Sequence, residues 1–170
     1  MGHPVLRAAA RPLEKSDVRS ASIQKLIDDM IETMREYHGV GLAAPQVHES
    51  VRLFVALLDA RDRSDDEEVE PEPIAIINPE ITVVGTDVVE DWEGCLSIPD
   101  IRGRVPRARE IRVRAMDRDG GRIELRAQEF PARVIQHETD HLDGVLFFDR
   151  MRSFESLTFL EEYSRFQKPD

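Results

Sequence analysis

Hydrophobic residues recur every three or four positions along the first long element of the chain, residues 22–37, with charged residues between them. This pattern predicts an amphipathic helix, and Gly39 is expected to end it. A second helix is predicted over residues 131–142, because its first residue is a proline, which a first turn tolerates, and Gly144 favours a helix end. Apolar positions between residues 154 and 163 predict a last amphipathic helix.

Apolar runs rich in β-branched residues predict strands of a mainly antiparallel sheet. These runs span residues 51–58, 74–77, 81–89, 111–117 and 122–127. Between the last two, residues 117–121 read Asp-Arg-Asp-Gly-Gly, which predicts a hairpin turn because Asp and Gly adopt positive φ angles readily. Helices and antiparallel strands together predict an α+β fold.

Composition narrows the class of protein. The chain has 170 residues, the size of one domain, so a single domain over residues 1–170 is expected. The net charge of −11 argues against direct binding to DNA, RNA or an anionic membrane. We find no secretion signal and no apolar run near the roughly 18 residues of a membrane-spanning helix. The single cysteine, Cys95, excludes an internal disulfide and fits the reducing cytoplasm.

Residues 62–73 are rich in aspartate and glutamate. Such runs are usually solvated, so this segment is predicted to be a mobile loop. The alternative is an acidic docking segment for a basic partner.

Two histidines at helical spacing are the sharpest chemical signal. His137 and His141 lie four residues apart in the second predicted helix and therefore project from the same face. This spacing allows two imidazoles to bind one metal ion, and Glu138 follows the first histidine, where a general base can act on a metal-bound water. Two residues are candidates for the third ligand. Cys95 follows a flexible glycine, whereas Glu161 lies at a distance typical of zinc endopeptidases.

Residues 39–46 form a glycine-rich segment with one amide side chain, Gln46. The segment matches neither of the common phosphate-binding patterns, since no Gly-Lys-Ser/Thr follows. A tight loop that carries an amide donor is the better interpretation, and such a donor can stabilise a developing oxyanion.

Three segments in this order resemble the motifs of the peptide deformylases. They read Gly-Val-Gly-Leu-Ala-Ala-Pro-Gln at 39–46, Glu-Gly-Cys-Leu-Ser at 93–97 and Gln-His-Glu-Thr-Asp-His-Leu-Asp-Gly at 136–144. The resemblance extends from Pro-Val-Leu-Arg near the start to Leu-Phe-Phe-Asp-Arg-Met at 146–151, and so covers nearly the whole chain. It implies an α+β domain in which antiparallel strands surround a central metal-binding helix.

The resemblance also assigns roles to residues. It implies three metal ligands with water in the fourth position, namely Cys95, His137 and His141. Glu138 becomes the general base and acid, Gln46 and the backbone N–H of Leu96 donate to the formyl oxygen, and Arg102 contacts the substrate backbone. The pocket for the methionine side chain would be lined by Val40, Gly41, Phe130, Arg133 and Val134, with Arg133 contributing its aliphatic stem.

The implied reaction removes the formyl group from the N-terminal formyl-methionine of nascent polypeptides, giving formate and a free N-terminal methionine. A thiolate with two imidazoles suits Zn²⁺, Ni²⁺, Co²⁺ or Fe²⁺, and the resemblance implies Fe²⁺. A ribosome contact would be transient and would need a local patch or a basic ribosomal protein. Competing hypotheses are a zinc endopeptidase and a noncatalytic nascent-chain or metal-binding module.

Two positions depart from the usual family pattern. His48 follows Gln46 closely and is expected to be a solvated loop residue, with a pH-sensitive modulator as the alternative. Glu129 stands where the family often has a glycine, just before the metal-binding helix.

Overall fold

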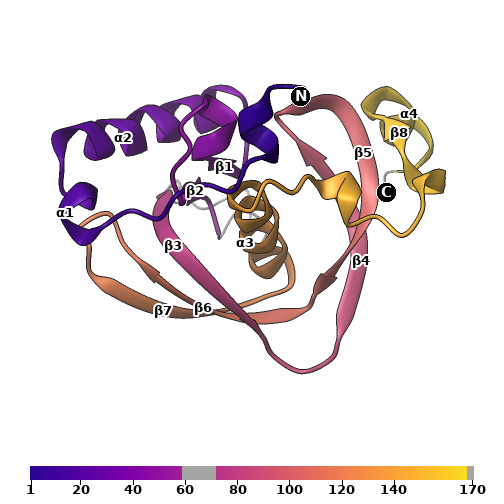
Figure 1. Cartoon of the computed structure of the whole chain (residues 1–170). Coiled ribbons are helices and arrows are strands. Elements are labelled where there is room, and N and C mark those ends of the chain that lie inside the picture. Colours follow the sequence, from indigo (N-terminus) through magenta and orange to yellow (C-terminus); the bar gives the residue numbers. More distant parts are fainter. Residues whose placement is uncertain (59–71, 168–170) are drawn as a thin grey trace, which may run out of the picture.

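One helix, α3 (Glu129–Leu142), lies in the middle of the molecule between two antiparallel sheets (Figure 1). This computed structural model of the chain describes residues 1–58 and 72–167. Helices and antiparallel sheets are both present, as predicted for an α+β fold. Among the described residues, no helix is both long and apolar enough to cross a membrane.

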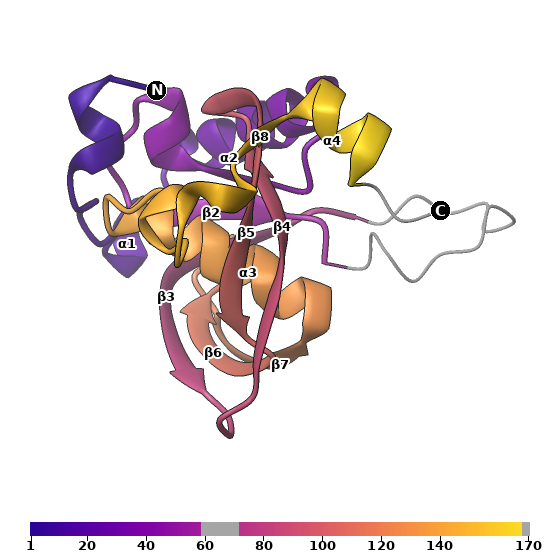
Figure 2. The ribbon, with the colours of Figure 1, turned by 90° about the vertical axis from the view of Figure 1, so that its right-hand side faces the viewer.

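The first sheet has five strands in the order β1-β2-β3-β6-β7 and the second has three in the order β4-β5-β8. The first consists of β1 (Gly41–Ala43), β2 (Leu53–Ala56), β3 (Ile74–Val83), β6 (Glu110–Met116) and β7 (Arg122–Gln128). The second consists of β4 (Val88–Cys95), β5 (Ile98–Ala108) and β8 (Thr158–Phe159). Every strand pair is antiparallel, and in Figure 2 β4 and β5 cross in front of α3.

Helices cover these sheets and connect them. The α-helices besides α3 are α1 (Lys15–Val18), α2 (Ala21–Glu36) and α4 (Leu160–Phe166). Short 3-10 helices are η1 (Pro4–Arg7), η2 (Ala44–Val47), η3 (Phe147–Asp149) and η4 (Phe154–Ser156). Helix α4 packs on the second sheet through Tyr163, whose ring meets that of Trp92 edge-on at 5.0 Å.

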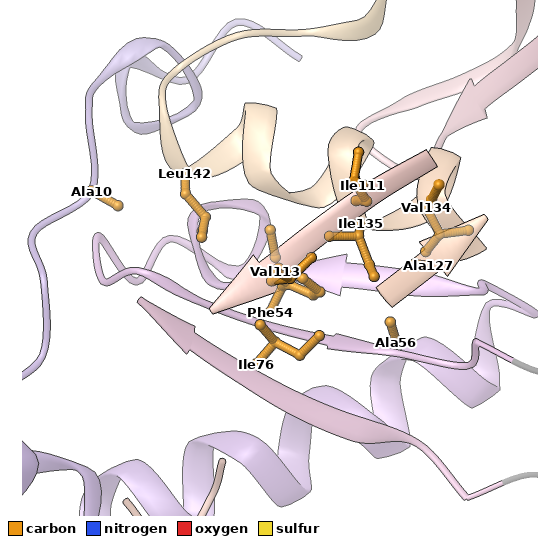
Figure 3. Packing of buried hydrophobic residues seen from close by; sticks show 12 residues of the cluster. Ala10, Phe54, Ala56, Ile76, Ile111, Val113, Ala127, Val134, Ile135 and Leu142 are labelled. Atoms are coloured by element: carbon orange, nitrogen blue, oxygen red, sulfur yellow. The ribbon is translucent and has the colours of Figure 1, made fainter. Parts of the chain in front are cut away.

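The apolar run of β2 is continuous because both faces of this strand are buried. Side chains alternate across a strand, so Phe54 packs in the core beneath α3 while Leu53 and Val55 pack against α2 on the opposite face. All four residues of β2 are buried. The core beneath α3 also holds Ile135 of the helix (Figure 3). Burial of the apolar face of α3 in this core holds the helix against the first sheet.

Several predicted elements agree closely with the structure. The helix predicted over residues 22–37 is α2, capped by Ser20, whose hydroxyl accepts a hydrogen bond from the backbone N–H of Ile23. The hairpin turn joins β6 to β7, with Gly120 at φ +74°. Gly144 ends α3 at φ +73°, and Val145 N–H donates to the carbonyl of Asp140, as in a Schellman motif.

Three predictions about element boundaries and helix ends were wrong. Residues 81–89 are not one strand, because β3 ends at Val83 and Gly85 at φ +73° turns the chain into β4. Residues 154–163 are not one helix but η4, β8 and the start of α4. Gly39 is not the left-handed residue after α2: His38 has φ +52°, and Gly39 N–H donates to the carbonyl of Met34.

Strand β5 was not predicted, because its three arginines and two prolines interrupt the apolar positions. The acidic segment predicted over residues 62–73 lies outside the described residues except for its last two positions.

Candidate metal centre and active site

Three side chains from two elements converge beside α3. The Cys95 thiol and one ring nitrogen from each of His137 and His141 all lie within 4.8 Å of one another. Cys95 Sγ is 3.3 Å from His141 Nε2, and the two imidazole rings are 5.0 Å apart. The helix supplies both histidines because they are one turn apart, whereas Cys95 is the last residue of β4.

The end of β4 is irregular, which directs the thiol towards α3. The pairing with β5 jumps from Gly94 opposite Arg102 to Cys95 opposite Ile98. The Arg102 side chain lies directly against the backbone of Gly94, so a Cβ at that position would overlap the guanidinium. Backbone N–H of Ser97 donates to Cys95 Sγ at 3.4 Å, which helps to hold the thiol in place.

The donor set fits a divalent transition metal. Burial holds the pKa of His141 well below its ordinary value, so this ring is a neutral ligand. Burial also lowers the pKa of His137, but hydrogen bonds with Cys95 and Glu93 outweigh it and raise that pKa well above the ordinary value. A positive charge is therefore favoured next to the thiol, and a bound cation would take the place of this proton. One thiolate and two imidazoles suit zinc, iron, nickel and cobalt alike.

Glu138 follows His137 on α3 and carries a buried carboxylate. Its side chain is 4% exposed, and Oε2 has no hydrogen-bond partner among the described residues. Burial raises the pKa of Glu138 to about 7, although the charge of His137 opposes the shift. A carboxyl group with this pKa can both take and give a proton near neutral pH.

A buried carboxylate orients the first histidine. Glu93 Oε2 lies 2.9 Å from His137 Nδ1, which leaves the other ring nitrogen for a metal. Arg107 forms a double hydrogen bond with Glu93 and a third bond to Asp140, so buried charges are paired. The sequence pattern did not predict these partners. A usable signal existed, since Glu93 and Cys95 are two residues apart on a strand and share a face.

The predicted oxyanion donors lie beside the thiol. Gln46 is in η2, its Oε1 accepts from the backbone N–H of Ala43 at 2.8 Å, and its Nε2 is 3.2 Å from Ser97 Oγ and 3.5 Å from Cys95 Sγ. Leu96 follows the thiol and is 38% exposed. The amide of Gln46 is thus oriented by its carbonyl end, with its donor end towards the site.

The five predicted pocket residues lie in different surroundings. Phe130 and Arg133 line a cavity of about 370 Å³ near the start of α3. Val134 is buried in the core instead, Gly41 packs against Glu138, and Val40 is 37% exposed. These three do not line that cavity.

Arg133 lies deeper than a residue at the rim of a pocket. Its side chain is 7% exposed, and its guanidinium is bound to Glu93 and to backbone carbonyls. The main contacts of Arg133 are therefore made by its guanidinium, whereas the sequence led us to expect a contribution from the aliphatic stem.

Three other sequence candidates lie elsewhere. Glu161 is exposed in the first turn of α4 and is not part of the metal-binding group, which argues against the zinc-endopeptidase hypothesis. His48 is exposed, and its ring stacks on that of His3 at 4.2 Å. Glu129 has φ +52°, a backbone conformation that glycine adopts most easily.

Comparison with known proteins agrees with this geometry. The family model described as polypeptide deformylase matches residues 1–156. Peptide deformylase 2 of Nostoc sp. is 47% identical over 163 residues, which cover 96% of this chain and 89% of the relative. The crystal structure of peptide deformylase from Thermotoga maritima matches with a TM-score of 0.78 and 40% identity, covering 90% of this chain and 95% of that one.

A third match carries a bound peptide. The Met-Ala-Ser-bound class I type b peptide deformylase from Acinetobacter baumannii has a TM-score of 0.78 and 36% identity, covering 89% of this chain and 94% of that one. With the family model spanning most of the sequence, the chain belongs to the peptide deformylase family, metal-dependent hydrolases that remove the N-terminal formyl group from polypeptides.

Proposed function

We propose that residues 1–170 form one catalytic domain in which Cys95, His137 and His141 bind a single divalent ion. Glu138 is the acid–base group of the deformylation. One observation carries these assignments: a buried carboxylate with an unpaired oxygen lies next to the Cys/His/His group. A metal-storage site has no need of such a group, whereas hydrolysis of an amide needs a base for the attacking water and an acid for the leaving amine.

The side chains divide the reaction between them. A divalent ion, when bound, supplies Lewis-acid activation. Glu138 takes a proton from the water that attacks the formyl carbon. Gln46 Nε2 and the backbone N–H of Leu96 donate to the formyl oxygen as it becomes negative. The C–N bond then breaks, Glu138 hands its proton to the amine nitrogen, and formate leaves.

The substrate is a formyl-methionyl nascent chain. The relative from Acinetobacter baumannii binds Met-Ala-Ser, which has the free N-terminal methionine of a deformylated product. In this chain Arg102 lies beside Gly94, next to Cys95, where its donors can contact a peptide backbone. Val40, Gly41, Phe130, Arg133 and Val134 remain the proposed surroundings of the methionine side chain.

The working metal is proposed to be Fe²⁺ and the compartment the cytoplasm. A ferrous centre with a thiolate ligand is sensitive to oxygen, through oxidation of the metal or of Cys95, so activity should fall in air. Contact with the ribosome is transient and uses a local patch or a basic ribosomal protein, because a chain of net charge −11 is repelled by RNA.

The deciding experiment is anaerobic turnover of a formyl-methionyl peptide by the iron-loaded protein, with metal content measured in parallel. Glu138→Ala should keep its metal and lose turnover, whereas Cys95→Ala should lose both. Glu161→Ala, a change at the exposed alternative ligand, should behave like the wild type. Absence of formate release from the metal-loaded wild type would contradict the proposed function.

A further inference from the structure

The carboxylate behind His137 is held by more donors than its orientation needs. Glu93 Oε1 accepts from Arg107 Nε at 2.9 Å and from Arg133 Nη1 at 2.7 Å. Its Oε2 accepts from Arg107 Nη2 at 3.0 Å and faces His137 Nδ1 at 2.9 Å. Arg107 alone would already pair this charge with a two-point contact. The need to pair the charge of Glu93 therefore does not explain why a second cation, Arg133, contacts this carboxylate.

Arg133 connects the elements that carry the metal ligands. It lies on α3, one turn before His137, and faces the second sheet. Its guanidinium donates to the carbonyl of Val89 on β4 at 2.7 Å and to the carbonyl of Val105 on β5 at 2.8 Å. Two of the proposed ligands come from α3 and the third ends β4, so the relative placement of helix and sheet sets the distances between ligands.

We propose that Arg133 is a positioning residue for the metal site. Its guanidinium holds α3 against β4 and β5, and it fixes Glu93 so that the second oxygen of that carboxylate remains directed at His137. The inference rests on the ligand set given under Proposed function. It assigns no contact between Arg133 and the metal or the reacting atoms.

A nearby arginine provides a matched control. Arg109 follows Arg107 by two residues and pairs with Glu129 in the first turn of α3 at 3.1 Å. This pair also joins the helix to the strand region, but both side chains are more than half exposed and neither reaches Glu93. Exposed pairs contribute little, so Arg109→Met removes a helix-to-strand cation without loosening the carboxylate.

The test measures metal affinity by competition of Co²⁺ with a chelator, together with the visible absorption spectrum of the cobalt-loaded protein. Loss of an outer partner of a metal-binding histidine typically lowers metal affinity 10- to 100-fold. We expect Arg133→Met to weaken Co²⁺ binding by about tenfold or more and to change the ligand-field bands. Arg109→Met should leave both unchanged.

A double-mutant cycle tests the route of the effect. If Arg133 acts through Glu93, the loss of affinity caused by Arg133→Met should shrink in a Glu93→Gln background. Arg133→Lys keeps the charge but cannot bridge three acceptors, so an intermediate affinity is expected. If Arg133→Met does not fold, the lysine variant decides the question alone.

These measurements distinguish a failure of the inference about Arg133 from a failure of the proposed ligand set. Wild-type affinity and spectrum in the folded Arg133 variants, even with reduced thermal stability, would overturn the inference and leave Arg133 a structural residue. His137→Ala provides the second reference. If that variant binds Co²⁺ as tightly as the wild type, the ligand set itself is wrong.

Discussion

The backbone of Gly41 lies directly against the carboxylate of Glu138, so closely that a Cβ on Gly41 would overlap it. The three atoms nearest to that Cβ all belong to Glu138. Strand β1 contributes no side chain here, so the Glu138 side chain of α3 packs directly on the β1 backbone and is confined from one side. The second glycine of the Gly-Val-Gly segment is therefore a requirement of close packing.

Gly41→Ala should displace the carboxylate of Glu138. A misplacement of about 1 Å costs on the order of 100-fold in rate, so kcat should fall by this order while metal content is retained. Steady-state kinetics and metal analysis check the prediction. Gly85→Ala is the control for backbone strain far from the site: alanine is disfavoured at φ +73°, but its Cβ would meet nothing within 4 Å, so this variant should lose some stability and keep the wild-type kcat. Equal kcat for Gly41→Ala and the wild type would contradict the proposed role of Glu138.

Gln46→Ala removes the amide donor beside Cys95. Loss of one oxyanion donor typically costs about 3 to 4 kcal/mol of the activation barrier, so kcat should fall roughly 100- to 1,000-fold. Ser97→Ala is the matched control, because it removes the hydroxyl within 3.2 Å of Gln46 Nε2 and keeps the donor itself. A raised KM with unchanged kcat would mean that Gln46 only binds the substrate.

The buried carboxyl of Glu138 should make the metal-free protein less stable as pH rises. Its folded pKa of about 7 lies above the ordinary 4.5, so this group favours folding at pH below 4.5 and loses that contribution as pH rises to about 7. The loss is at most about 3 kcal/mol. Glu138→Gln should abolish this part of the pH dependence.

Urea unfolding of both metal-free proteins between pH 5 and pH 8.5 measures the difference. The free energy of unfolding of the wild type should fall relative to that of Glu138→Gln across this range. Other titrating groups, His137 included, are common to the two proteins and largely cancel in the comparison. Parallel curves would show that Glu138 has an ordinary pKa.

Arg107→Met should destabilise the fold strongly. Arg107 is 6% exposed and contacts both Glu93 and Asp140, so its removal leaves two buried carboxylates with fewer partners. Breaking a buried charge network in this way costs about 3 to 5 kcal/mol of the free energy of unfolding, measurable with urea. Arg126→Met breaks an exposed pair with Glu110 and should have a far smaller effect.

Features that lie within one element follow from the sequence alone. The four-residue spacing of His137 and His141 places both rings on one face of any helix, because 3.6 residues make a turn. Gly144 ends that helix for an equally local reason, a positive φ. Together with the motifs at 39–46 and 93–97, these features were sufficient to identify the family and its α+β fold.

Which distant residues meet depends on the tertiary structure. Cys95 and Glu161 were both open as partners of the histidines, and the irregular end of β4 brings Cys95 to them while Glu161 stays exposed on α4. The bonds from Arg133 to Glu93 and to two strands were equally hidden. Backbone geometry sets distances within a helix or strand, whereas distances between elements depend on strand register and packing across the whole chain.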